Sequence, residues 1–600
     1  MKDPVQKIKE LDGKQLYYSF LAGAQRIFEH QKLLNKINVF PVADADTGTN
    51  LASTMRSIMD AFIPTDNPKQ TATALADAAL TGARGNSGII FAQFLYGFSN
   101  EIKTEQSLDI EAFTGSMKRA VNYAYEAIAN PVEGTILTVI KDWADYMYAF
   151  KDRVDDFIKL LIQAYNKALE SLAQTTNKLE VLARAHVVDA GAKGFVFFLE
   201  GLVDFFTKGA DQKLIDLVQT AEVSTEKVVM PHDEISFRFC TEALISGTNL
   251  EKSGIMNFIG HCGDSLVVAG SPSKMRVHIH TDFPAEVFSQ LQRFGNITYQ
   301  KVDDMVMQND ILLNRKSNIA IMTDSTCDLP KSILDQYQIH VVPLSVHFGD
   351  SYYLDRLTIQ PQQFYSLLEK SVINPSSAQP ASKDFQNKYE YLATHYNSIF
   401  GIHISQGMSG TYSNSQIASR EVAARTEKRI DVFNSKNLTG GLGLIVLRAA
   451  KALEEGASHD EIAASMDQWI SNAKIFVSVP TLKYIVRSGR VSPFRGFIAS
   501  ALDLKPVIVL NEEGKTELSG KSFTEKASAQ KLIRSIEKAI AQKPVWEYAI
   551  THANNQKMVD YYVSEMMKLT GKRPVFIDHA SPALVANTGP GVACISLMME

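Results

Sequence analysis

The chain reads Asp44-Ala45-Asp46-Thr47-Gly48-Thr49-Asn50 immediately before the helix-prone segment Leu51-Ala52-Ser53-Thr54-Met55. The two aspartates offer the hard carboxylate oxygens that Mg²⁺ accepts when it bridges nucleotide phosphates. The hydroxyls, the amide and the backbone N–H groups that follow would lie at a helix N-terminus, where anions bind. The candidate phosphate ligands here are Thr47, Thr49 and Asn50. Taken alone, the stretch is equally typical of an Asx-turn with an ordinary helix cap.

A second loop of small residues repeats this arrangement, since Gly82-Ala83-Arg84-Gly85-Asn86-Ser87-Gly88 precedes the apolar residues 89–95. Two further small-residue turns, 131–135 and 188–191, also open apolar helices and could line the nucleotide. The candidate residues in these three loops are Gly85, Asn86, Ser87, Gly88, Thr135, Asp189 and Gly191. Two phosphate cradles in one helical segment are hard to explain by capping alone. We therefore predict a Mg²⁺-dependent, ATP-using phosphotransferase domain in the N-terminal third.

The composition is that of a multidomain globular protein. Apolar residues make up 45% of the 600 positions and charged residues 21%. The formal charge is -5 and no block of Lys or Arg stands out, which argues against nucleic acid as a partner. The four cysteines are scattered without CxxC spacing, so a disulfide framework is not expected.

We expect no transmembrane segment and a cytoplasmic protein. The start of the chain lacks an apolar core of signal-peptide length. The most apolar stretch, residues 194–206, is interrupted by Glu200 and Asp204 and is too short to span a bilayer. It is typical of a buried helix.

Hydrophobic periodicity divides the chain into three parts. Apolar residues recur three and four apart up to about residue 208, as in Phe157-Leu160-Leu161-Ala164, which predicts an all-α domain over 1–208. A polar linker follows, and short β-rich runs with helices between them predict a small α+β domain over 232–310. From 317 to 600, β-rich runs alternate with helical segments, which indicates an α/β module.

Two histidines in the middle domain have the spacing of metal ligands. His278 and His280 are two apart on an expected strand, so both imidazoles would project from one face. Cys240 follows another expected strand and could add a thiolate, a ligand set that suits zinc. A pair of histidines at this spacing is more often a packing feature, and the residues alone leave both interpretations open.

In the C-terminal module, a β-rich run leads into Ser405-Gln406-Gly407-Met408-Ser409-Gly410-Thr411 and then into a helix. This loop would present hydroxyls and N–H groups to a carboxylate or a phosphate. A well-capped loop without a ligand is the alternative.

The four N-terminal motifs also carry a family resemblance. The run from Asn38 to Asn50, with 82–88, Glu133-Gly134-Thr135 and 187–191, resembles the kinase domain of bacterial fatty acid kinase. That domain is related to the nucleotide-binding L subunit of dihydroxyacetone kinase. The resemblance implies a helical barrel in which Asp44 and Asp46, with Asn38, hold Mg²⁺ and ATP. Ala45 departs from the glycine that the family usually has.

The middle segments resemble the middle domain of the same family, which implies zinc at Cys240, His278 and His280. The C-terminal motifs, among them Thr323–Pro330, Ser376–Pro380 and Thr588–Gly591, resemble the DegV family of two-domain fatty-acid-binding proteins. This resemblance implies that Ser377, with Ser405 or Ser409, holds a fatty acid carboxylate, and that Arg487 or Arg490 serves kinase docking or phosphate contact. The full substrate set that it suggests is Ser377, Ser405, Ser409, Gly410 and Asn587. Asn587 stands where the family commonly has histidine, so the positive charge near the carboxylate is lost.

The preferred hypothesis is ATP-dependent phosphorylation of a protein-bound fatty acid carboxylate to an acyl phosphate. Expected partners are the fatty acid and a separate acyl-binding carrier or acyltransferase, and we expect a homodimer. Because of Asn587, the C-terminal module could be a true acyl carrier or only a docking domain. Two alternatives stay open: a lipid-binding or regulatory protein with an inactive kinase domain, and a kinase of a triose-like metabolite.

Overall fold

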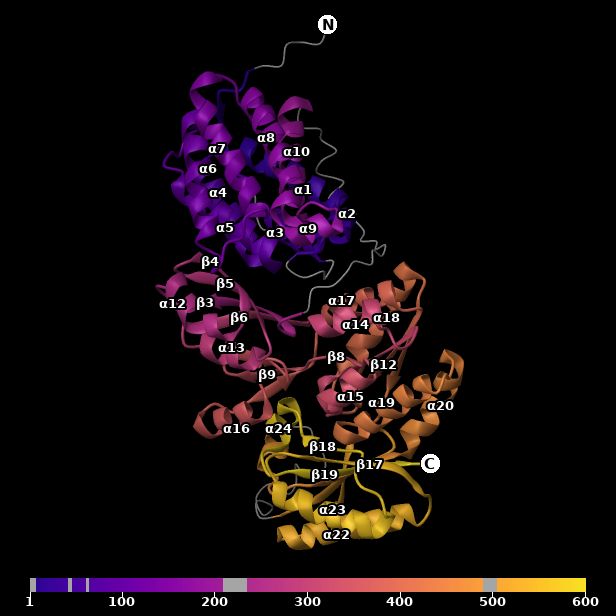
Figure 1. Ribbon diagram of the computed structural model, residues 1–600. Coiled ribbons are helices and arrows are strands. Elements are labelled where there is room, and N and C mark those ends of the chain that lie inside the picture. Colours follow the sequence, from indigo (N-terminus) through magenta and orange to yellow (C-terminus); the bar gives the residue numbers. More distant parts are fainter. Residues whose placement is uncertain (1–6, 41–45, 61–63, 209–234, 489–503) are drawn as a thin grey trace. The chain divides into compact units, whose positions relative to one another are not determined.

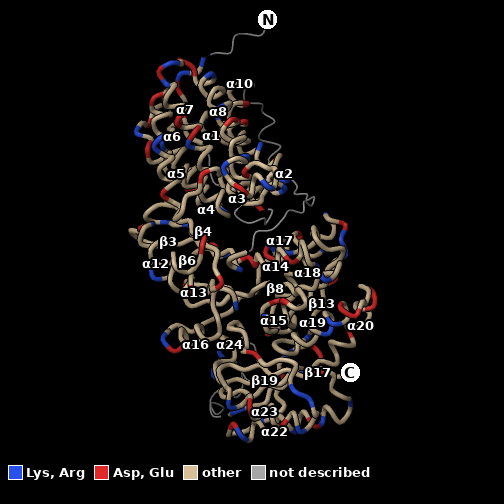
Figure 2. The backbone as a smooth tube through the Cα atoms, viewed as in Figure 1, with Lys and Arg blue, Asp and Glu red and all other residues tan. Residues whose placement is uncertain are grey.

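A computed structural model describes residues 7–40, 46–60, 64–208, 235–488 and 504–600 (Figure 1). The chain divides into two compact units, Met1–Asn309 and Asp310–Glu600. In the view of Figure 2, acidic and basic residues alternate along the described backbone of each unit. Among the described residues, every helix is too short or too polar to cross a membrane.

The first unit begins with a helical bundle, as the 3.6-residue periodicity predicts. Its α-helices are α1 (Gly13–Glu29), α2 (Gln31–Lys36), α3 (Thr47–Asp60), α4 (Pro68–Gly82), α5 (Gly85–Glu101), α6 (Ile110–Tyr125), α7 (Ile136–Phe150), α8 (Phe157–Lys178), α9 (Glu180–Ala185) and α10 (Ala190–Lys208). Polar caps start several of them: the side chains of Asp12, Asn67 and Asp109 each accept a backbone N–H of the first turn. Two short strands, β1 (Glu10–Leu11) and β2 (Leu108–Asp109), pair with each other and link the segment before α1 to the segment before α6.

Helices α5 and α10 form the centre of this bundle. α5 is buried around most of its circumference, as expected for a helix that is apolar on all sides. Phe91 of α5 and Phe20 of α1 both pack edge-on against Phe198 of α10, with ring centroids 4.9 and 5.1 Å apart. The apolar stretch 194–206 is therefore a core helix, as its length and charge pattern predict.

A four-stranded antiparallel sheet completes the first unit. Its strands are β3 (Phe239–Ser246), β4 (Asp264–Ser271), β5 (Lys274–Thr281) and β6 (Asn296–Asp304), in the order β4-β5-β3-β6. One face packs on α12 (Lys252–Ile259) and α13 (Pro284–Leu291) through residues such as Ile245, Val277 and Phe288. The opposite face meets the helical bundle, since Val267 and Ala269 belong to the bundle core.

The edge of β4 is closed by the loop that follows α6. Val268 donates its N–H to the carbonyl of Ala127 at 2.7 Å, and Ala129 donates to that of Leu266 at 3.1 Å. Gln93 of α5 also accepts the N–H of Gly270 at 2.6 Å. These bonds satisfy backbone groups that an edge strand would otherwise expose, and they hold the sheet on the bundle.

The second unit contains a parallel sheet followed by a larger mixed sheet. The parallel sheet has the order β13-β12-β7-β8, with β7 (Ile319–Asp324), β8 (His340–Val342), β12 (Ser398–His403) and β13 (Arg429–Asn434). Its accompanying helices are α15 (Lys331–Gln336), α17 (Ser382–His395) and α18 (Thr411–Thr426). A small antiparallel sheet, β10-β9-β11, uses β9 (Ser345–Phe348), β10 (Ser351–Leu354) and β11 (Ser376–Ala378), with α16 (Pro361–Lys370) nearby in sequence. The helix α14 (Met305–Leu313) lies at the boundary of the two units.

The mixed sheet has the order β16-β15-β14-β19-β17-β18. Its strands are β14 (Ala473–Ser478), β15 (Val507–Leu510), β16 (Thr516–Gly520), β17 (Val545–His552), β18 (Phe576–His579) and β19 (Ala593–Met599). The remaining helices of this unit are α19 (Thr439–Glu454), α20 (His459–Asn472), α21 (Lys483–Ser488), α22 (Glu525–Ile540), α23 (Gln556–Thr570) and α24 (Pro582–Thr588). The α/β layering expected from the sequence is present in both parts.

Gly201 should be essential to the packing of α10 on α1. A Cβ at this position would lie 2.2 Å from the carbonyl oxygen of Ala22. Overpacking of this kind costs about 1–3 kcal/mol, which outweighs the roughly 1 kcal/mol that alanine gains over glycine in a helix. We expect Gly201→Ala to lower the midpoint of thermal unfolding of the first unit by several degrees in calorimetry.

Gly254 in α12 provides the matched control. The nearest atoms to a Cβ there are 3.9 Å away, so Gly254→Ala should leave the midpoint unchanged or raise it. Equal midpoints for the two variants would contradict the close helix contact.

Candidate functional site

The first candidate site begins at the N-terminus of α3. Thr47 and Asn50 are buried in its first turn, and the carbonyl of Asp46 accepts the N–H of Asn50 at 2.8 Å. Asp46 is partly exposed just before the helix. Asp44, the other predicted Mg²⁺ ligand, lies outside the described residues. The helix end predicted to bind anions is thus present directly after Asp46.

The first turn of α5 packs directly on that of α3. Gly85 has a φ of 57°, in the left-handed region, and a Cβ there would lie 2.3 Å from Asn50 Nδ2. A Cβ on Gly88 would lie 2.7 Å from Thr54 Oγ1. Glycine is required at these positions because the two helix N-termini lie side by side.

The N-termini of α10 and α7 lie next to the first turn of α5. A Cβ on Gly191 would lie 2.4 Å from Ser87 Oγ, so α10 begins beside the first turn of α5. The carboxylate of Asp189 accepts the N–H of Ala192 in α10 at 2.7 Å and that of Ile136, which follows the α7 cap residue Thr135. Burial raises the pKa of Asp189 to about 6. The structure therefore brings together all four loops selected from the sequence.

Several predicted ligands already have protein partners. Thr49 Oγ1 accepts from Gln31 Nε2 at 3.1 Å and from Asn35 Nδ2 at 3.0 Å, which leaves its own hydrogen to donate. Asn38 is buried, and its N–H donates to the carbonyl of Asn35 at 3.4 Å. By contrast, Asn86 Oδ1 is a buried acceptor with no hydrogen-bond partner within the described chain, so a donor group of a ligand or a cation fits there.

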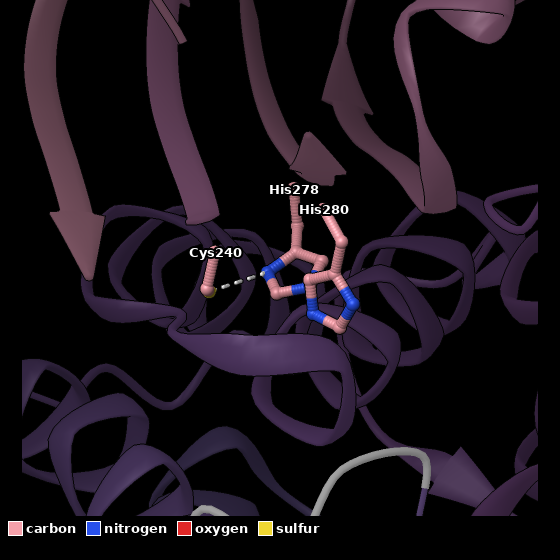
Figure 3. Close-up of side chains that lie close together, drawn as sticks. All are labelled: Cys240, His278 and His280. Atoms are coloured by element: carbon pink, nitrogen blue, oxygen red, sulfur yellow. Dashed lines mark hydrogen bonds between the residues drawn. The ribbon is translucent and has the colours of Figure 1, made fainter. Parts of the chain in front are cut away.

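The predicted metal ligands of the middle domain also meet. Figure 3 shows the side chains of Cys240, His278 and His280 pointing toward one another from β3 and β5. One ligand atom from each lies within 4.8 Å of the others, and Cys240 Sγ is 3.8 Å from His278 Nδ1. The three residues are buried, and His280 Nδ1 lies 3.4 Å from the carboxylate of Asp264.

This cluster fits a zinc ion. His278 Nε2 is buried and finds no partner in the part of the chain that the structure describes, which is costly unless a ligand occupies it. Burial lowers the pKa of His278, which keeps the imidazole neutral and able to bind a metal. Burial and the charge of Glu242 raise the pKa of the Cys240 thiol, so zinc binding must displace its proton. One sulfur and two nitrogens are the donor set that zinc prefers.

Around these ligands the same sheet face carries charged side chains that sequence reasoning did not assign to the site. Glu242 and Arg276 are each 1% exposed, and their side chains are joined at 3.0 Å. Glu242 Oε1 also accepts the N–H of Gly85 at 2.6 Å. Lys301 lies opposite Glu242 in β6 and pairs with Asp303 at 2.5 Å. A sequence signal could have identified Glu242 and Arg276. Each lies two residues from a predicted metal ligand, Cys240 or His278, and therefore on the same face of its strand.

Asp46 and this sheet face belong to one electrostatic site. Burial lowers the pKa of Lys301, but the carboxylates of Asp303, Glu242 and Asp46 raise it well above its usual range. The charge of Asp46 likewise raises the pKa of His278 against the effect of burial. Asp46, directly before α3, is therefore near enough to the Cys240, His278 and His280 cluster for its charge to influence that cluster.

The second unit contains a cavity of about 480 Å³. Its walls are largely apolar, with Leu344, Ile404 and Met408 from the first part of the unit and Ile475, Val477 and Ile508 from the mixed sheet. This is the size and lining of a typical small-molecule site.

The cavity wall includes four of the predicted substrate residues: Ser377, Ser409, Gly410 and Asn587. Asn587 Nδ2 donates to Ser377 Oγ at 2.9 Å and to the carbonyl of Ala583 at 2.8 Å. The Ser377 hydroxyl thus keeps its own hydrogen for another acceptor. Ser405 is not on the cavity wall, because its buried hydroxyl donates to the carbonyl of Gly514 at 2.8 Å.

The predicted docking residue Arg487 is exposed at the end of α21. Its guanidinium donates to Asn374 and lies 5.1 Å from the centre of the Tyr484 ring. Arg490 lies outside the described residues.

A Ser-His-Asp array also occurs in the second unit. His403 Nδ1 lies 3.3 Å from Asp324 Oδ2, and His403 Nε2 lies 2.8 Å from Ser415 Oγ. All three side chains are fully buried, and Tyr389 OH lies 2.7 Å from the serine oxygen. None of the three lines the cavity, so this array holds β7, β12 and α18 together and is not a hydrolytic centre.

Comparison with protein families matches three segments of the chain. Residues 41–204 match the DAK2 domain, and residues 236–311 match the FakA-like middle domain of fatty acid kinases. Residues 318–600 match the uncharacterised proteins of the DegV family. The chain combines a DAK2 domain, a FakA-like middle domain and a DegV domain. The resemblances identified from the sequence motifs are thereby confirmed.

Similar curated proteins match about half of the chain. The chain is 33% identical to protein YloV of Bacillus subtilis over 325 residues, which cover 52% of this chain and 59% of that protein. It is 34% identical to an uncharacterized protein of Staphylococcus saprophyticus over 338 residues, which cover 53% and 60%. The chain thus spans about 60% of the length of these relatives.

Solved structures of DegV family proteins match just under half of the chain. A fatty-acid-binding DegV family protein from Thermus thermophilus is 26% identical, with 47% of this chain and 99% of that chain covered and a TM-score of 0.44. DegV of Bacillus subtilis, described as a fatty acid binding protein, is also 26% identical, with 47% and 100% covered and a TM-score of 0.43.

The metal site can be tested by measuring the zinc content of the purified protein. We expect purified protein to hold about one zinc ion per chain and Cys240→Ser or His280→Ala to lose it, because a Cys-His-His site needs all three ligands. Metal content after dialysis, measured by mass spectrometry, checks this.

Cys262 is the matched control, since it is a partly exposed cysteine of the same domain outside the cluster. Cys262→Ser should retain the zinc. The same metal content in Cys240→Ser and in Cys262→Ser would rule the site out.

Proposed function

We propose that this chain uses ATP and Mg²⁺ to phosphorylate a fatty acid carboxylate, giving an acyl phosphate. The observation that carries the proposal is the convergence of the starts of α3, α5, α7 and α10 beside Asp46 and beside the sheet that carries Cys240, His278 and His280. The DAK2 and FakA-like domains suggest a kinase, and the DegV domain suggests the class of acceptor. We assign the kinase domain to 1–208, the middle domain to 232–310 and the acyl-binding domain to 317–600.

The nucleotide would bind with its phosphates at the paired first turns of α3 and α5. Helix N-termini present N–H groups and a positive dipole end to anions. Thr47, Thr49 and Asn50 add polar groups from α3, and Asn86 and Ser87 add them from α5. The carboxylate oxygens of Asp46, with those of Asp44, form the hard donor set that suits Mg²⁺. When bound, Mg²⁺ supplies charge neutralisation on the phosphate oxygens.

The reaction itself demands little covalent chemistry from the protein. A carboxylate oxygen of the fatty acid forms a bond to the γ-phosphorus, the bond from that phosphorus to the β–γ bridging oxygen breaks, and ADP leaves. The carboxylate is ionised near neutral pH, so no general base is required. The residues of the chain hold the two reactants in line and stabilise charge. Lys301, whose pKa the charge of Asp46 helps to raise, would add a positive charge on the same side of the sheet.

The cavity of the second unit would hold the acyl chain. Its apolar walls suit a hydrocarbon, and Ser377 and Ser409 would donate hydrogen bonds to the carboxylate. Asn587 would act indirectly, because its amide fixes the Ser377 hydroxyl at 2.9 Å. The neutral amide leaves the carboxylate charge unpaired, so the same cavity also supports a weaker carrier or a docking domain for a separate carrier.

Asp46 should be essential for turnover. Loss of a Mg²⁺ ligand removes several kcal/mol of charge stabilisation, so Asp46→Asn should lower kcat by roughly 10²- to 10³-fold. Acyl phosphate can be trapped with hydroxylamine as a hydroxamate in a mixture of protein, fatty acid, ATP and Mg²⁺. Asp60→Asn, at the exposed far end of the same helix, should retain activity. Hydroxamate formation at the wild-type rate by Asp46→Asn would exclude the assigned metal ligand.

Ser377 should be needed for fatty acid binding. A hydrogen bond to a charged group contributes about 1.5–3 kcal/mol, so Ser377→Ala should weaken binding about tenfold or more. Displacement of a fluorescent fatty acid measures the dissociation constant. The exposed neighbour Ser376 serves as the control, and Ser376→Ala should bind normally. If native mass spectrometry finds no fatty acid bound to the wild-type protein even after incubation with the lipid, the acyl site is wrong.

A further inference from the structure

Glu242 has an unusual position for a carboxylate, because it is buried between two candidate ligand sites. Its Oε1 accepts the N–H of Gly85, the first residue of α5, at 2.6 Å. The same oxygen lies 3.7 Å from Nδ1 of the candidate metal ligand His278. Its Oε2 accepts from Arg276 at 3.0 Å. One carboxylate oxygen is thus shared between the phosphate side and the metal side.

On the metal side, Glu242 has the position of a supporting residue. Histidines that bind a metal through one ring nitrogen usually donate the other N–H to a carboxylate or carbonyl. His278 Nε2 has no partner in the described structure, and Nδ1 lies between Glu242 Oε1 at 3.7 Å and Cys240 Sγ at 3.8 Å. A shift of less than about 1 Å would convert the 3.7 Å separation into a charge-assisted hydrogen bond. Glu242 would then hold the imidazole in the orientation that a metal at Nε2 requires.

On the phosphate side, Glu242 holds the end of α5. A carboxylate on a helix N-terminal N–H is a charge-assisted bond and is favoured by the helix dipole. Gly85 in turn packs on the side chain of Asn50, with no room for a Cβ. A displacement of Oε1 would therefore move the first turn of α5 against the first turn of α3, where the nucleotide phosphates are proposed to bind.

Arg276 keeps this carboxylate from moving independently of the sheet. It is buried to the same extent as Glu242, and its guanidinium lies 4.2 Å from the centre of the Tyr299 ring. Removing one partner of a buried ion pair is strongly unfavourable, so Glu242 stays attached to β5 and to α5 together. The carboxylate is a rigid connection between the two sites.

We propose that Glu242 is a positioning residue that couples metal occupancy at Cys240, His278 and His280 to nucleotide affinity at the N-termini of α3 and α5. This inference rests on the proposed kinase function. The coupling is reciprocal by thermodynamic linkage, so bound nucleotide also strengthens metal binding. Zinc bound to the sheet then raises the affinity of the nucleotide site for its ligand.

The test uses the full chain and two binding measurements. The dissociation constant of ADP in the presence of Mg²⁺ is measured by calorimetry on zinc-loaded protein and on protein treated with a chelator selective for zinc. Zinc affinity is measured by competition with a chromophoric chelator. In the wild type we expect zinc removal to weaken ADP binding about 5- to 150-fold, the usual range of coupling between sites.

In Glu242→Gln the zinc affinity should fall about 10- to 100-fold, as for other residues that support a metal ligand. The ratio of the ADP dissociation constants with and without zinc should approach one. Glu242→Asp keeps the charge but is too short to reach both Gly85 and His278, so it should fold and lose the same coupling. Asp304→Asn is the matched control, because Asp304 pairs with Arg238 in the same sheet without contacting the cluster, and its coupling should equal that of the wild type.

The outcomes separate the two proposals. Wild-type protein that binds ADP equally well with and without zinc overturns the coupling but leaves the kinase assignment standing. Unchanged zinc affinity and unchanged coupling in both Glu242 variants overturn the role of Glu242. Failure of the wild type to bind ADP in either state overturns the proposed function and the inference together.

Discussion

The hydrogen bond from the Gly85 N–H to the Glu242 carboxylate joins the helical bundle to the sheet at the point where the candidate ligands meet. It places a buried negative charge at the start of α5, and the charge is stable there because Arg276 and the helix end share it. Burial alone would raise the pKa of Glu242, but its hydrogen bonding and the charges of Lys301 and Arg276 hold the pKa below its usual range. The carboxylate is therefore ionised near neutral pH.

This contact explains why the site is composite. The bundle supplies helix N-termini, hydroxyls and aspartate oxygens, which suit phosphate and Mg²⁺. The sheet supplies a thiol and two imidazoles, which suit zinc. The two sets of ligands differ in hardness and need not compete for one metal ion. Their proximity follows from the packing of the sheet on α5, since Glu242 of β3 binds the N–H of Gly85 and Gly85 packs on Asn50 of α3.

The second unit uses its polar residues in two different ways. Asp324, His403, Ser415 and Tyr389 satisfy one another in the interior and hold the parallel sheet to its helices. Ser377, Ser409 and Asn587 instead lie on the wall of a largely apolar cavity. The array that resembles a hydrolytic triad is structural, because burial removes it from any substrate. The cavity wall, with its free serine hydrogen, is where a ligand can be recognised.

The fold classes and the local motifs of this protein could be predicted from its amino-acid sequence. Loops of small residues before apolar helices identify 47–50, 85–88 and 188–191, and the two-residue spacing of His278 and His280 predicts that both face one side of a strand. These signals are local, because helix and strand periodicity place neighbours in sequence on a common face. Three other features could be seen only in the folded chain. Gly85 contacts both Asn50 and Glu242. Lys301 lies opposite Glu242 in the sheet, and the Ser405 side chain points away from the cavity. These contacts join residues far apart in the chain, and they depend on how the sheets and helices pack, which no local pattern encodes.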